Sequence, residues 1–580
     1  MPMGRPIQSV TIVGGGTAGW LTAAMLNHRL QWGYGHPDGV KITLIESPDT
    51  PTVGVGESTL PAIKQTLELL EISEAEFVTR TNATFKMGVK FEGWHAKQGP
   101  RRETFYHPLT GGVQLAGRNP AASLLTYGVP DQFPLENELG DIVSHAVAAV
   151  EAGRSPRHPQ HRPFDGSFGY AYHLDAGLLA EFLREVATAR GVVHVLDHVV
   201  GMTKNARGHI ETLELKRGGH HEVELVIDCT GFGGILINKI MGEPFVSYAD
   251  FLPNDRAVAL QVEHGPGQSL FPATRVTALD AGWRWRIPLQ SRMGTGYVFS
   301  SAFAEDQAAI DELNATQVGE APLMQPKVLK MRIGRCARSW VGNVVSIGLS
   351  SGFIEPLEST AIQFIDFACR RLLLSLPSSD FEDSCRDKFN AEINDLYDEV
   401  RDFLSLHFTL GDREDTPYWR ACRHEVKQSD RLKECLAIWR HTLPDVYDPW
   451  LGKVFNYLSV SDILIGKGFY SGGLNTGADL MPETMWREYL AEVMRVRPRL
   501  LGPLPTPEVA LAAMAKTFTP GESAHRAPAI HSRVQQGVAL GLTQRVMDSN
   551  PAIPPPEPAS PGKVVRPAPI FGLVSAPQGR

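Results

Sequence analysis

The sequence lacks paired cysteines, long uncharged apolar runs and blocks of like charge. Its six cysteines are scattered and form no CxxC or Cys/His set with the spacing of metal ligands. In a chain of 580 residues this pattern predicts reduced thiols and no bound metal, rather than a disulfide framework. No uncharged run reaches membrane-spanning length, and a strand-like stretch at residues 9–13 leaves no room for a signal peptide. The cytoplasm is therefore the expected location.

Charge and composition narrow the class of protein further. The net charge of −8 is spread along the chain, which disfavours a nucleic acid or an anionic membrane as the partner. With 43% hydrophobic and 21% charged residues the composition is that of a globular protein, and the length allows two or three structural units. The exception is the end, where nine of the last thirty residues are proline. Such a segment buries too little apolar surface to offset its ordering entropy, so a mobile tail is predicted.

The first fifty residues have the pattern of a strand, a helix and a second strand. Apolar stretches at 9–13 and 41–45 flank a glycine-rich turn and a helical pattern over 20–30. Farther on, strands and loops alternate until about residue 345, and helices dominate from residue 362 to about residue 500. The sequence therefore predicts an α/β fold with a mainly helical C-terminal part.

Three glycines in the first turn carry a dinucleotide-binding pattern. Gly14, Gly16 and Gly19 fit G-x-G-x-x-G: the first permits the tight turn, the second lets backbone N–H groups approach a pyrophosphate, and the third lets the helix pack on the strand. Glu46 ends the second strand, where its carboxylate can accept hydrogen bonds from ribose hydroxyls. The motif alone does not separate FAD from NAD. A later turn at 228–232 (DCTGF) follows another apolar strand and favours FAD, with a plain surface turn as the alternative.

Four segments of the chain resemble one family closely. They read GGGTAGW at 14–20, GVGEST at 54–59, GWRWRIP at 282–288 and GFIEPLEST at 352–360. The third contains a W-x-W-x-I-P signature that ordinary flavin monooxygenases lack. On these segments the chain resembles the flavin-dependent tryptophan halogenases, and the match runs in family order from residue 10 to about residue 470. Residues 54–59 resemble the mobile strap that covers the cofactor in that family.

The resemblance implies a fold and a division of the chain. Residues 1–378 would form a Rossmann-like FAD-binding and halide-activating domain of the flavin monooxygenase type. Residues 379–505 would form a helical substrate-side subdomain, and residues 506–580 the proline-rich tail. By family position, the residues that line the FAD site would be Gly14, Gly16, Thr17, Ala18, Gly19, Glu46, Ser47, Glu57, Ser58, Val199, Leu357 and Ile362.

The same resemblance implies an FADH2-dependent halogenase. Reduced FAD would come from a separate flavin reductase and react with O2, and chloride or bromide would attack the resulting C4a-hydroperoxide to give hypohalous acid. The acceptor would be an indole or another electron-rich aromatic compound, and a homodimer stays open. Two rival functions remain. One is an aromatic hydroxylase that uses the hydroperoxide directly, and the other is a flavin-binding protein without catalysis.

The residue that handles the oxidised halide matches Lys86 by family position. A primary amine suits this role, because the protonated form polarises hypohalous acid and the neutral form can become a haloamine. Removal from water lowers the pKa of a lysine and makes both forms accessible. From the residues alone Lys90 is an equal candidate, and either lysine could be a solvated side chain on a strand face.

Glu358, with Ser359 beside it, is the second catalytic candidate. Attack of the electrophile on an aromatic carbon creates a cation that must lose a proton, and a carboxylate facing the ring can stabilise the cation and accept that proton. The alternative is an acid at a helix start, where negative charge is favourable in any protein. The resemblance favours the catalytic role.

The halide site and the partition between flavin and substrate also follow from the resemblance. Backbone amides of Thr360 and Ala361 would hold the halide, as amides at a helix N-terminus do. The family usually has glycine at the place of Ala361, so a methyl group is added and a positive φ would become costly. Trp283 and Trp285 would form an apolar wall between flavin and substrate, with core packing of a half-buried strand as the alternative.

The substrate segment is where the sequence departs most from the free-tryptophan halogenases. Those enzymes carry an aromatic- and asparagine-rich segment in the helical half of the chain. Here residues 455–462 read FNYLSVSD and lack the paired Phe-Trp and Tyr-Tyr elements. The resemblance thus implies an indole or another aromatic substrate, with free tryptophan as one candidate among several.

Overall fold

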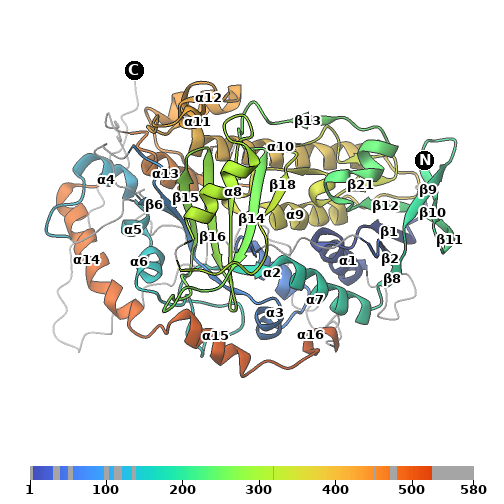
Figure 1. The fold of residues 1–580 in the computed structure, drawn as a ribbon, viewed down its shortest axis with the longest axis horizontal. Coiled ribbons are helices and arrows are strands. Elements are labelled where there is room, and N and C mark those ends of the chain that lie inside the picture. The colour runs from blue at the N-terminus through green and yellow to red at the C-terminus, as the bar shows by residue number, and fades with distance from the viewer. Residues whose placement is uncertain are drawn as a thin grey trace, which may run out of the picture. The chain divides into compact units, whose positions relative to one another are not determined.

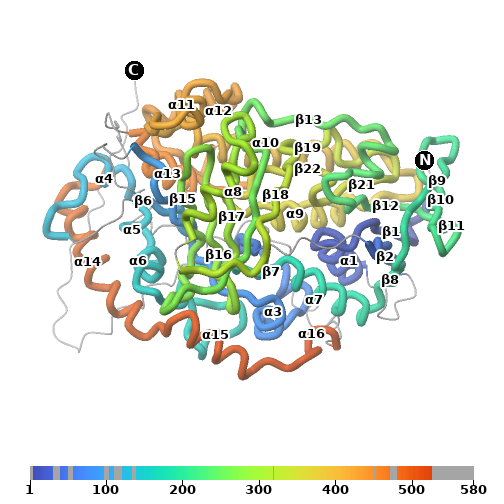
Figure 2. The backbone as a smooth tube through the Cα atoms, in the orientation of Figure 1, coloured from blue at the N-terminus to red at the C-terminus, as the bar shows by residue number. Residues whose placement is uncertain are grey.

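The computed structural model describes residues 4–30, 39–49, 56–96, 104–109, 120–133, 139–317, 319–448, 451–470 and 480–525. All of them fall within one unit of the chain, residues 1–539. Figure 1 shows the arrangement of their helices and strands, and Figure 2 follows the backbone in the same orientation.

Short apolar segments build a six-stranded sheet around the first strand of the chain. Its strands, in the order in which they pair, are β20 (Trp340–Val341), β21 (Val344–Ser346), β12 (Leu225–Asp228), β1 (Ser9–Val13), β2 (Lys41–Glu46) and β8 (Val193–Leu196). All neighbours run parallel except β20 and β21. Helix α1 (Thr17–Leu30) follows β1 and contacts α7 (Ala176–Ala189) and α9 (Ala361–Leu374) (Figure 1). The predicted strand–helix–strand unit is confirmed, although α1 begins at Thr17, earlier than expected.

A seven-stranded sheet carries the tryptophan pair. Its strands pair in the order β18 (Lys327–Lys330), β14 (Arg256–Val262), β17 (Met293–Phe299), β16 (Gly282–Pro288), β15 (Thr274–Leu279), β5 (Gly88–Glu92) and β6 (Thr104–Pro108). Neighbours are antiparallel except β15 and β5, which run parallel. Helix α8 (Asp306–Ala315) contacts β14 and β17 (Figure 1). This sheet joins segments that are far apart in the sequence.

A small sheet connects these two parts. It pairs β3 (Gly56–Ser58), β7 (Ala171–Asp175) and β4 (Thr84–Lys86) in that order. Strand β3 lies against β16 and β17, where a Cβ on Gly56 would stand 3.4 Å from the Cα of Gly294. Two further three-stranded sheets comprise β9 (Val199–Lys204), β10 (Ile210–Leu215) and β11 (Gly219–Glu222), and β13 (Phe245–Ser247), β19 (Gly334–Cys336) and β22 (Gly352–Phe353).

Helices make up most of the chain after β22. The long α10 (Asp383–Thr409) is followed by α11 (Pro417–His424), α12 (Asp430–Trp439), α13 (Tyr457–Gly466) and α14 (Glu483–Leu501). Local signals explain three of the starts, because the side chains of Thr416, Ser429 and Asn456 each accept a backbone N–H from the first turn of the helix that follows. The earlier helices are α2 (Ala62–Leu69), α3 (Glu74–Arg80), α4 (Pro120–Tyr127), α5 (Leu139–Val143) and α6 (His145–Glu151), and the short turns are η1 (Gly231–Gly233), η2 (Ile235–Ile240), η3 (Gly348–Ser350) and η4 (Pro356–Glu358).

The predicted mobile tail is wrong for its first part. Residues 506–525 form α15 (Pro507–Ala515) and α16 (Glu522–His525), which contact α3 and α7 along the lower edge of Figure 1. Buried Glu76 accepts the backbone N–H groups of Gly521 and Ser523, each at 2.7 Å, and Arg190 donates to the Ser523 carbonyl at 2.5 Å. Apolar burial in α15 and these charged caps outweigh the proline content. Residues 526–580 lie outside the described part of the chain, and a mobile tail there stays a prediction.

Two truncations separate the helical from the proline-rich part of this segment. We expect a chain that ends at residue 525 to keep the melting temperature and FAD affinity of the full chain. A chain that ends at residue 505 should lose at least about 3 kcal/mol of stability, because Leu511 and Met514 of α15 are buried. Urea unfolding of the three proteins measures the difference. Equal stability of the two truncated chains would show that α15 and α16 add nothing to the fold.

Among the described residues, no helix is both long and apolar enough to cross a membrane. The six cysteines are free thiols, and within the described ranges no cluster of His, Cys, Asp and Glu has the geometry of a metal site.

Candidate active site

The β1–α1 turn has the shape that a dinucleotide requires. Gly14 has φ +116°, and a Cβ there would stand 2.2 Å from the Cys229 carbonyl oxygen. A Cβ on Gly19 would stand 1.8 Å from the Gly14 carbonyl oxygen, so α1 packs directly on the turn. A Cβ on Gly16, in contrast, would meet nothing within 4 Å. The space above Gly16, at the N-terminus of α1, is therefore open to a pyrophosphate, and the turn fits the cofactor.

Glu46 lies at the end of β2 beside this turn. Its side chain stands over Gly15, where a Cβ would be 2.1 Å from the carboxyl carbon. His194 of β8 holds one oxygen of Glu46 at 3.1 Å, which leaves the other oxygen for a ribose hydroxyl. The next predicted residue, Ser47, lies 3.4 Å from Nδ1 of His198. The acid that the sequence assigned to the ribose is thus in reach of the glycine turn.

The other predicted cofactor residues come from several elements, and some of them lie beside the β1–α1 turn. A Cβ on Gly348 of η3 would stand 2.6 Å from Cβ of Ala18, so η3 lies directly against α1. Thr17 donates to the Ala176 carbonyl at 3.3 Å, and Val199 packs with the cluster that contains Val13 and Ile45. Leu357 of η4 and Ile362 of α9 are both buried.

Strand β3 carries the described end of the predicted strap, Glu57 and Ser58. Ser58 Oγ lies 3.1 Å from Thr274 Oγ1. Burial, together with the charge of Asp175, raises the pKa of Glu57 to about 7. Gly54 and Val55 of this strap lie outside the described residues.

Lys86, the last residue of β4, is fully buried. Its Nζ donates to Ser359 Oγ and to the Thr59 carbonyl, both at 3.1 Å. Burial lowers its pKa to about 8, although the nearby charge of Glu358 opposes this shift. Both the amine and the ammonium forms are therefore accessible near neutral pH. The structure brings Lys86 and Ser359 together across 273 residues of sequence.

Lys90 occupies a different environment from Lys86. It belongs to β5 and forms an ion pair with Glu151 at 2.7 Å, near the ring of Tyr106. The two lysines were equal candidates by residue type. In the fold, Lys86 points at the Glu358–Ser359 turn and Lys90 is held by a carboxylate elsewhere.

Glu358 lies between two buried histidines that the sequence did not single out. His107 Nδ1 stands 2.9 Å from one carboxylate oxygen, and His407 Nε2 stands 3.0 Å from the other. Burial alone would raise the pKa of Glu358, but the charge and hydrogen bonds of the histidines overcome this and hold it at about 2. His107 comes from β6 and His407 from α10. Since neither stands in a local motif with Glu358, no signal in a single sequence could have found them.

The contacts of His407 determine how many protons Glu358, His107 and His407 can hold together. Its Nδ1 lies 3.2 Å from the Phe403 carbonyl oxygen, so both ring nitrogens face acceptors. A neutral imidazole has one N–H, and satisfying both contacts requires a second proton on His407 or a proton on Glu358. Burial lowers the pKa of His407 by more than the hydrogen bond and charge of Glu358 raise it, so the pKa of His407 is lowered on balance. The cluster of Glu358, His107 and His407 therefore contains a place for one extra proton.

The turn after Glu358 has an unusual backbone. Ser359 adopts a left-handed conformation, φ +63° and ψ +40°, which is strained for a residue with a side chain and is typical of functional turns. The positive φ falls on Ser359 and not on Ala361, which is the first residue of α9. The methyl group of Ala361 therefore adds no backbone strain. The amides of Thr360 and Ala361 stand at the N-terminus of a long helix, where an anion is favoured.

Trp283 and Trp285 share one face of β16. Their rings contact edge to face, with 6.3 Å between centroids. The ring of Trp285 lies over Gly296 of β17, where a Cβ would stand 2.0 Å from the indole. The indole N–H of Trp283, which is buried, donates to Glu355 in the segment before η4. The pair therefore connects the sheet to the turn that carries Glu358.

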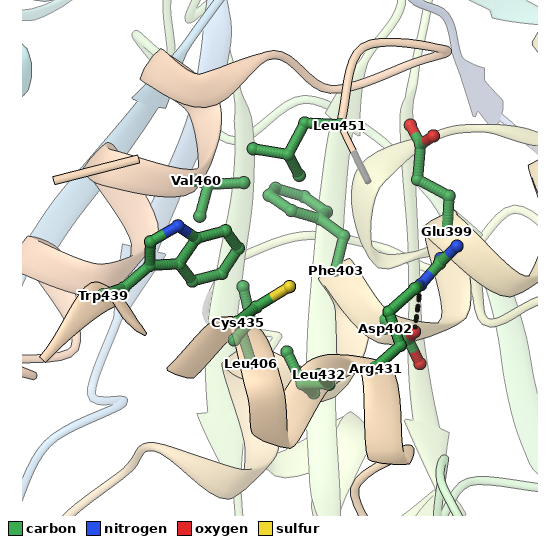
Figure 3. A pocket seen from close by; sticks show the side chains of 10 residues that line it. All are labelled: Glu399, Asp402, Phe403, Leu406, Arg431, Leu432, Cys435, Trp439, Leu451 and Val460. Carbon is green, nitrogen blue, oxygen red and sulfur yellow. Dashed lines mark hydrogen bonds and ion pairs between the residues drawn. The ribbon is translucent and has the colours of Figure 1, made fainter. Parts of the chain in front are cut away.

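An apolar region adjoins the histidines on the side of the helices. Phe403 of α10 stacks on Phe455 with 3.9 Å between ring centroids, and both rings contact His107. Behind Phe403, side chains of α10, α12 and α13 enclose a cavity of about 20 Å³, lined among others by Leu406, Leu432, Cys435, Trp439 and Val460 (Figure 3). This volume holds about one water molecule, so an aromatic substrate does not fit there while Phe403 keeps its position.

Comparison with known proteins places the chain in a family. The tryptophan halogenase family model matches residues 9–483. The chain belongs to the tryptophan halogenase family. It is 39% identical to the tryptophan 6-halogenase SttH of Streptomyces toxytricini over 76% of this chain and 85% of that protein. It is 38% identical to the tryptophan 7-halogenase RebH of Lentzea aerocolonigenes over 76% of this chain and 83% of that one.

Solved structures agree with this assignment. The crystal structure of SttH superposes with a TM-score of 0.80 at 36% identity, covering 88% of this chain and all of that one. BrvH, a flavin-dependent halogenase from Brevundimonas sp. BAL3, superposes with a TM-score of 0.77 at 34% identity, covering 88% and 99% of the two chains. The halogenase is thus a flavin-dependent enzyme with a Rossmann-like FAD-binding fold, and the hydroxylase and the non-catalytic alternatives are disfavoured.

Proposed function

We propose that this halogenase uses FADH2, O2 and chloride or bromide to halogenate an indole or another electron-rich aromatic compound. The observation that supports this most is the pair of neighbours Glu358 and Ser359. Glu358 is held by two histidines and Ser359 by Lys86, so the amine of Lys86 and the carboxylate of Glu358 meet at a single turn. Residues 1–378 would supply the cofactor and halide sites, and residues 379–505 would supply the substrate side.

The cofactor would lie on the β1–α1 turn, with Glu46 at its ribose and the η4 turn near its reactive end. When bound, reduced FAD together with O2 supplies the oxidising equivalent that converts halide into hypohalous acid. The amides of Thr360 and Ala361 would hold the halide. Trp283 and Trp285 would exclude the aromatic substrate from the flavin, so that only a small oxidant passes toward Lys86.

Lys86 would receive the hypohalous acid. As an ammonium it donates a hydrogen bond that polarises the oxygen–halogen bond. As a neutral amine it takes the halogen to give a haloamine, and the displaced hydroxide leaves as water with the amine proton. A pKa near 8 keeps both forms available, and Ser359 fixes the position of Nζ.

Glu358 would accept the proton that the aromatic ring loses. The cationic intermediate of aromatic substitution is a strong acid, so a carboxylate with a pKa near 2 still accepts its proton. His107 and His407 would orient the carboxylate, and the cluster's place for one extra proton would hold the proton until it exchanges with solvent.

A halide-dependent screen tests this function. Indoles, phenols and pyrroles are incubated with enzyme, a flavin reductase, NADH, FAD and chloride or bromide, and products are identified by mass. SttH and RebH are named for tryptophan, so free tryptophan is included. We expect a halogenated product that disappears without halide. A hydroxylated product that forms without halide would contradict the proposal.

The source of reduced flavin gives a second prediction. In the described residues no second Rossmann-type sheet is present that could hold a nicotinamide nucleotide. We therefore expect turnover only with a separate flavin reductase or with chemically reduced FAD. Sustained turnover on NADH and enzyme alone would show that the chain reduces its own flavin.

A further inference from the structure

Glu355 is a buried carboxylate for which the proposed reaction has so far no use. It is fully buried, three positions before Glu358, and Pro356 lies between them at the start of η4. One of its oxygens, Oε1, accepts the indole N–H of Trp283 and also the side-chain amide of Asn254 at 2.7 Å. Asn254 in turn accepts the hydroxyl of Tyr418 of α11 at 3.0 Å.

The second oxygen of Glu355 has no hydrogen-bond partner in the described part of the chain. An unpaired buried carboxylate oxygen costs folding free energy, and a residue kept only for packing would avoid that cost. Burial raises the pKa of Glu355 to about 7, although the hydrogen bonds of Trp283 and Asn254 lower it, so the carboxyl is largely neutral in a mildly acidic solution. The oxygen of Glu355 that accepts hydrogen bonds, Oε1, faces Trp283.

The connection from Glu355 to the catalytic turn is short and stiff. Proline fixes φ at position 356, and Ser359 N–H donates to the Pro356 carbonyl at 3.1 Å. A shift of Glu355 is therefore transmitted to Glu358 and Ser359. The same carboxyl group accepts a hydrogen bond from the indole N–H of Trp283. One side chain therefore fixes the separation between the Trp283–Trp285 pair and the turn of Glu358 and Ser359.

We propose that Glu355 is a positioning residue that locks the Trp283 wall to the turn of Glu358 and Ser359, so that hypohalous acid reaches Lys86 and does not escape. This inference rests on the proposed halogenase function. Glu355 would then control the fraction of hypohalous acid that is converted into halogenated product, and would not itself take part in the reaction.

The test measures coupling, which is the halogenated product formed per reduced flavin consumed, and traps escaped hypohalous acid with monochlorodimedone. For Glu355→Leu we expect coupling to fall by about tenfold with a matching rise in trapped oxidant, because misplaced reacting groups lose at least that much in rate. FAD affinity, measured by flavin fluorescence, should stay within the range of the unchanged enzyme. Glu355→Gln keeps an oxygen that can accept from Trp283 and Asn254, so it should restore coupling.

Two further variants keep the inference open to refutation. Trp283→Phe removes the same hydrogen bond from the other side and should leak oxidant as Glu355→Leu does, even if the latter fails to fold. Trp340→Phe is the matched control, because buried Trp340 donates to the Gly342 carbonyl at 3.0 Å on β20, away from the wall. It should lower stability without changing coupling.

The outcomes separate this inference from the proposed function. If the unchanged enzyme makes no halide-dependent product in this assay, the proposed function fails. If it does, and Glu355→Leu or Trp283→Phe retains full coupling, Glu355 has no positioning role. Equal leakage from Glu355→Gln and Glu355→Leu would also overturn the inference, because the hydrogen bond would then not be what matters.

Discussion

Replacing Lys86 by methionine should abolish halogenation, with a loss of at least about 10³-fold, while FAD still binds. The amine stands on β4 against Ser359 and the Thr59 carbonyl, away from the glycine turn, so the pyrophosphate and ribose sites lose no contact. Product mass and FAD affinity are measured on the same preparation. Lys90→Met is the matched control, because it removes an ion pair with Glu151 and should leave turnover intact. Full turnover by Lys86→Met would move the role to another residue.

The same substitution should also stabilise the fold. The folded-state pKa of Lys86 is about 8 and the ordinary value is 10.5, so the charged form is disfavoured in the folded chain. This cost is fully present below pH 8 and disappears as the pH rises from 8 to 10.5. By linkage it amounts to about 3 kcal/mol at pH 7. Lys86→Met should therefore unfold at higher urea concentration than the unchanged enzyme at pH 7, and the gain should shrink at pH 10.

Glu358→Gln should reduce turnover by at least about 10²-fold, the usual effect of removing a general base, while hypohalous acid is still formed. The amide also presents a donor to one of the two histidines, which disturbs their alignment. Turnover and trapped oxidant are compared with those of Glu74→Gln. That control removes another buried carboxylate, one that accepts the hydroxyls of Tyr170 and Tyr172.

Unchanged halogenation by Glu358→Gln would support a role as a simple helix-start acid. The contacts already argue against that role. Both carboxylate oxygens of Glu358 are within hydrogen-bond distance of imidazole nitrogens, and no side chain caps the N-terminus of α9.

Parts of the fold that depend on local pattern could be predicted from the sequence. The β1–α1–β2 unit and the position of Glu46 follow from apolar runs and glycine spacing within fifty residues, and the structure has them where expected. The histidines could not be found in this way. His107 belongs to residues 96–165, which are rich in Gly, Pro and His and have little periodic pattern, and only the pairing of β6 with β5 brings it to Glu358.

The choice between Lys86 and Lys90 shows why residue spacing was insufficient. On one continuous strand, residues four apart would share a face and have similar surroundings. The strand is interrupted at Met87, whose N–H donates to the Pro272 carbonyl at 2.8 Å. Lys86 therefore ends one sheet and Lys90 lies in another. The helices of residues 506–525 were missed for a related reason, since composition does not reveal that Glu76 and Arg190 bind their backbone.

The distances along the chain between the site residues have a consequence for protein synthesis. Ser359 is 273 residues from Lys86, and Glu358 is 251 residues from His107 and 49 from His407. Domains fold as units while the ribosome delivers the chain from its N-terminus, so residues 9–46 can form their nucleotide turn early. The two histidine contacts that hold Glu358 cannot both form until α10, which carries His407, has emerged from the ribosome. A nascent or prematurely terminated chain that ends before residue 407 lacks the His407 contact to Glu358, so the carboxylate proposed to take the aromatic proton is held on both sides only in chains whose translation has passed α10.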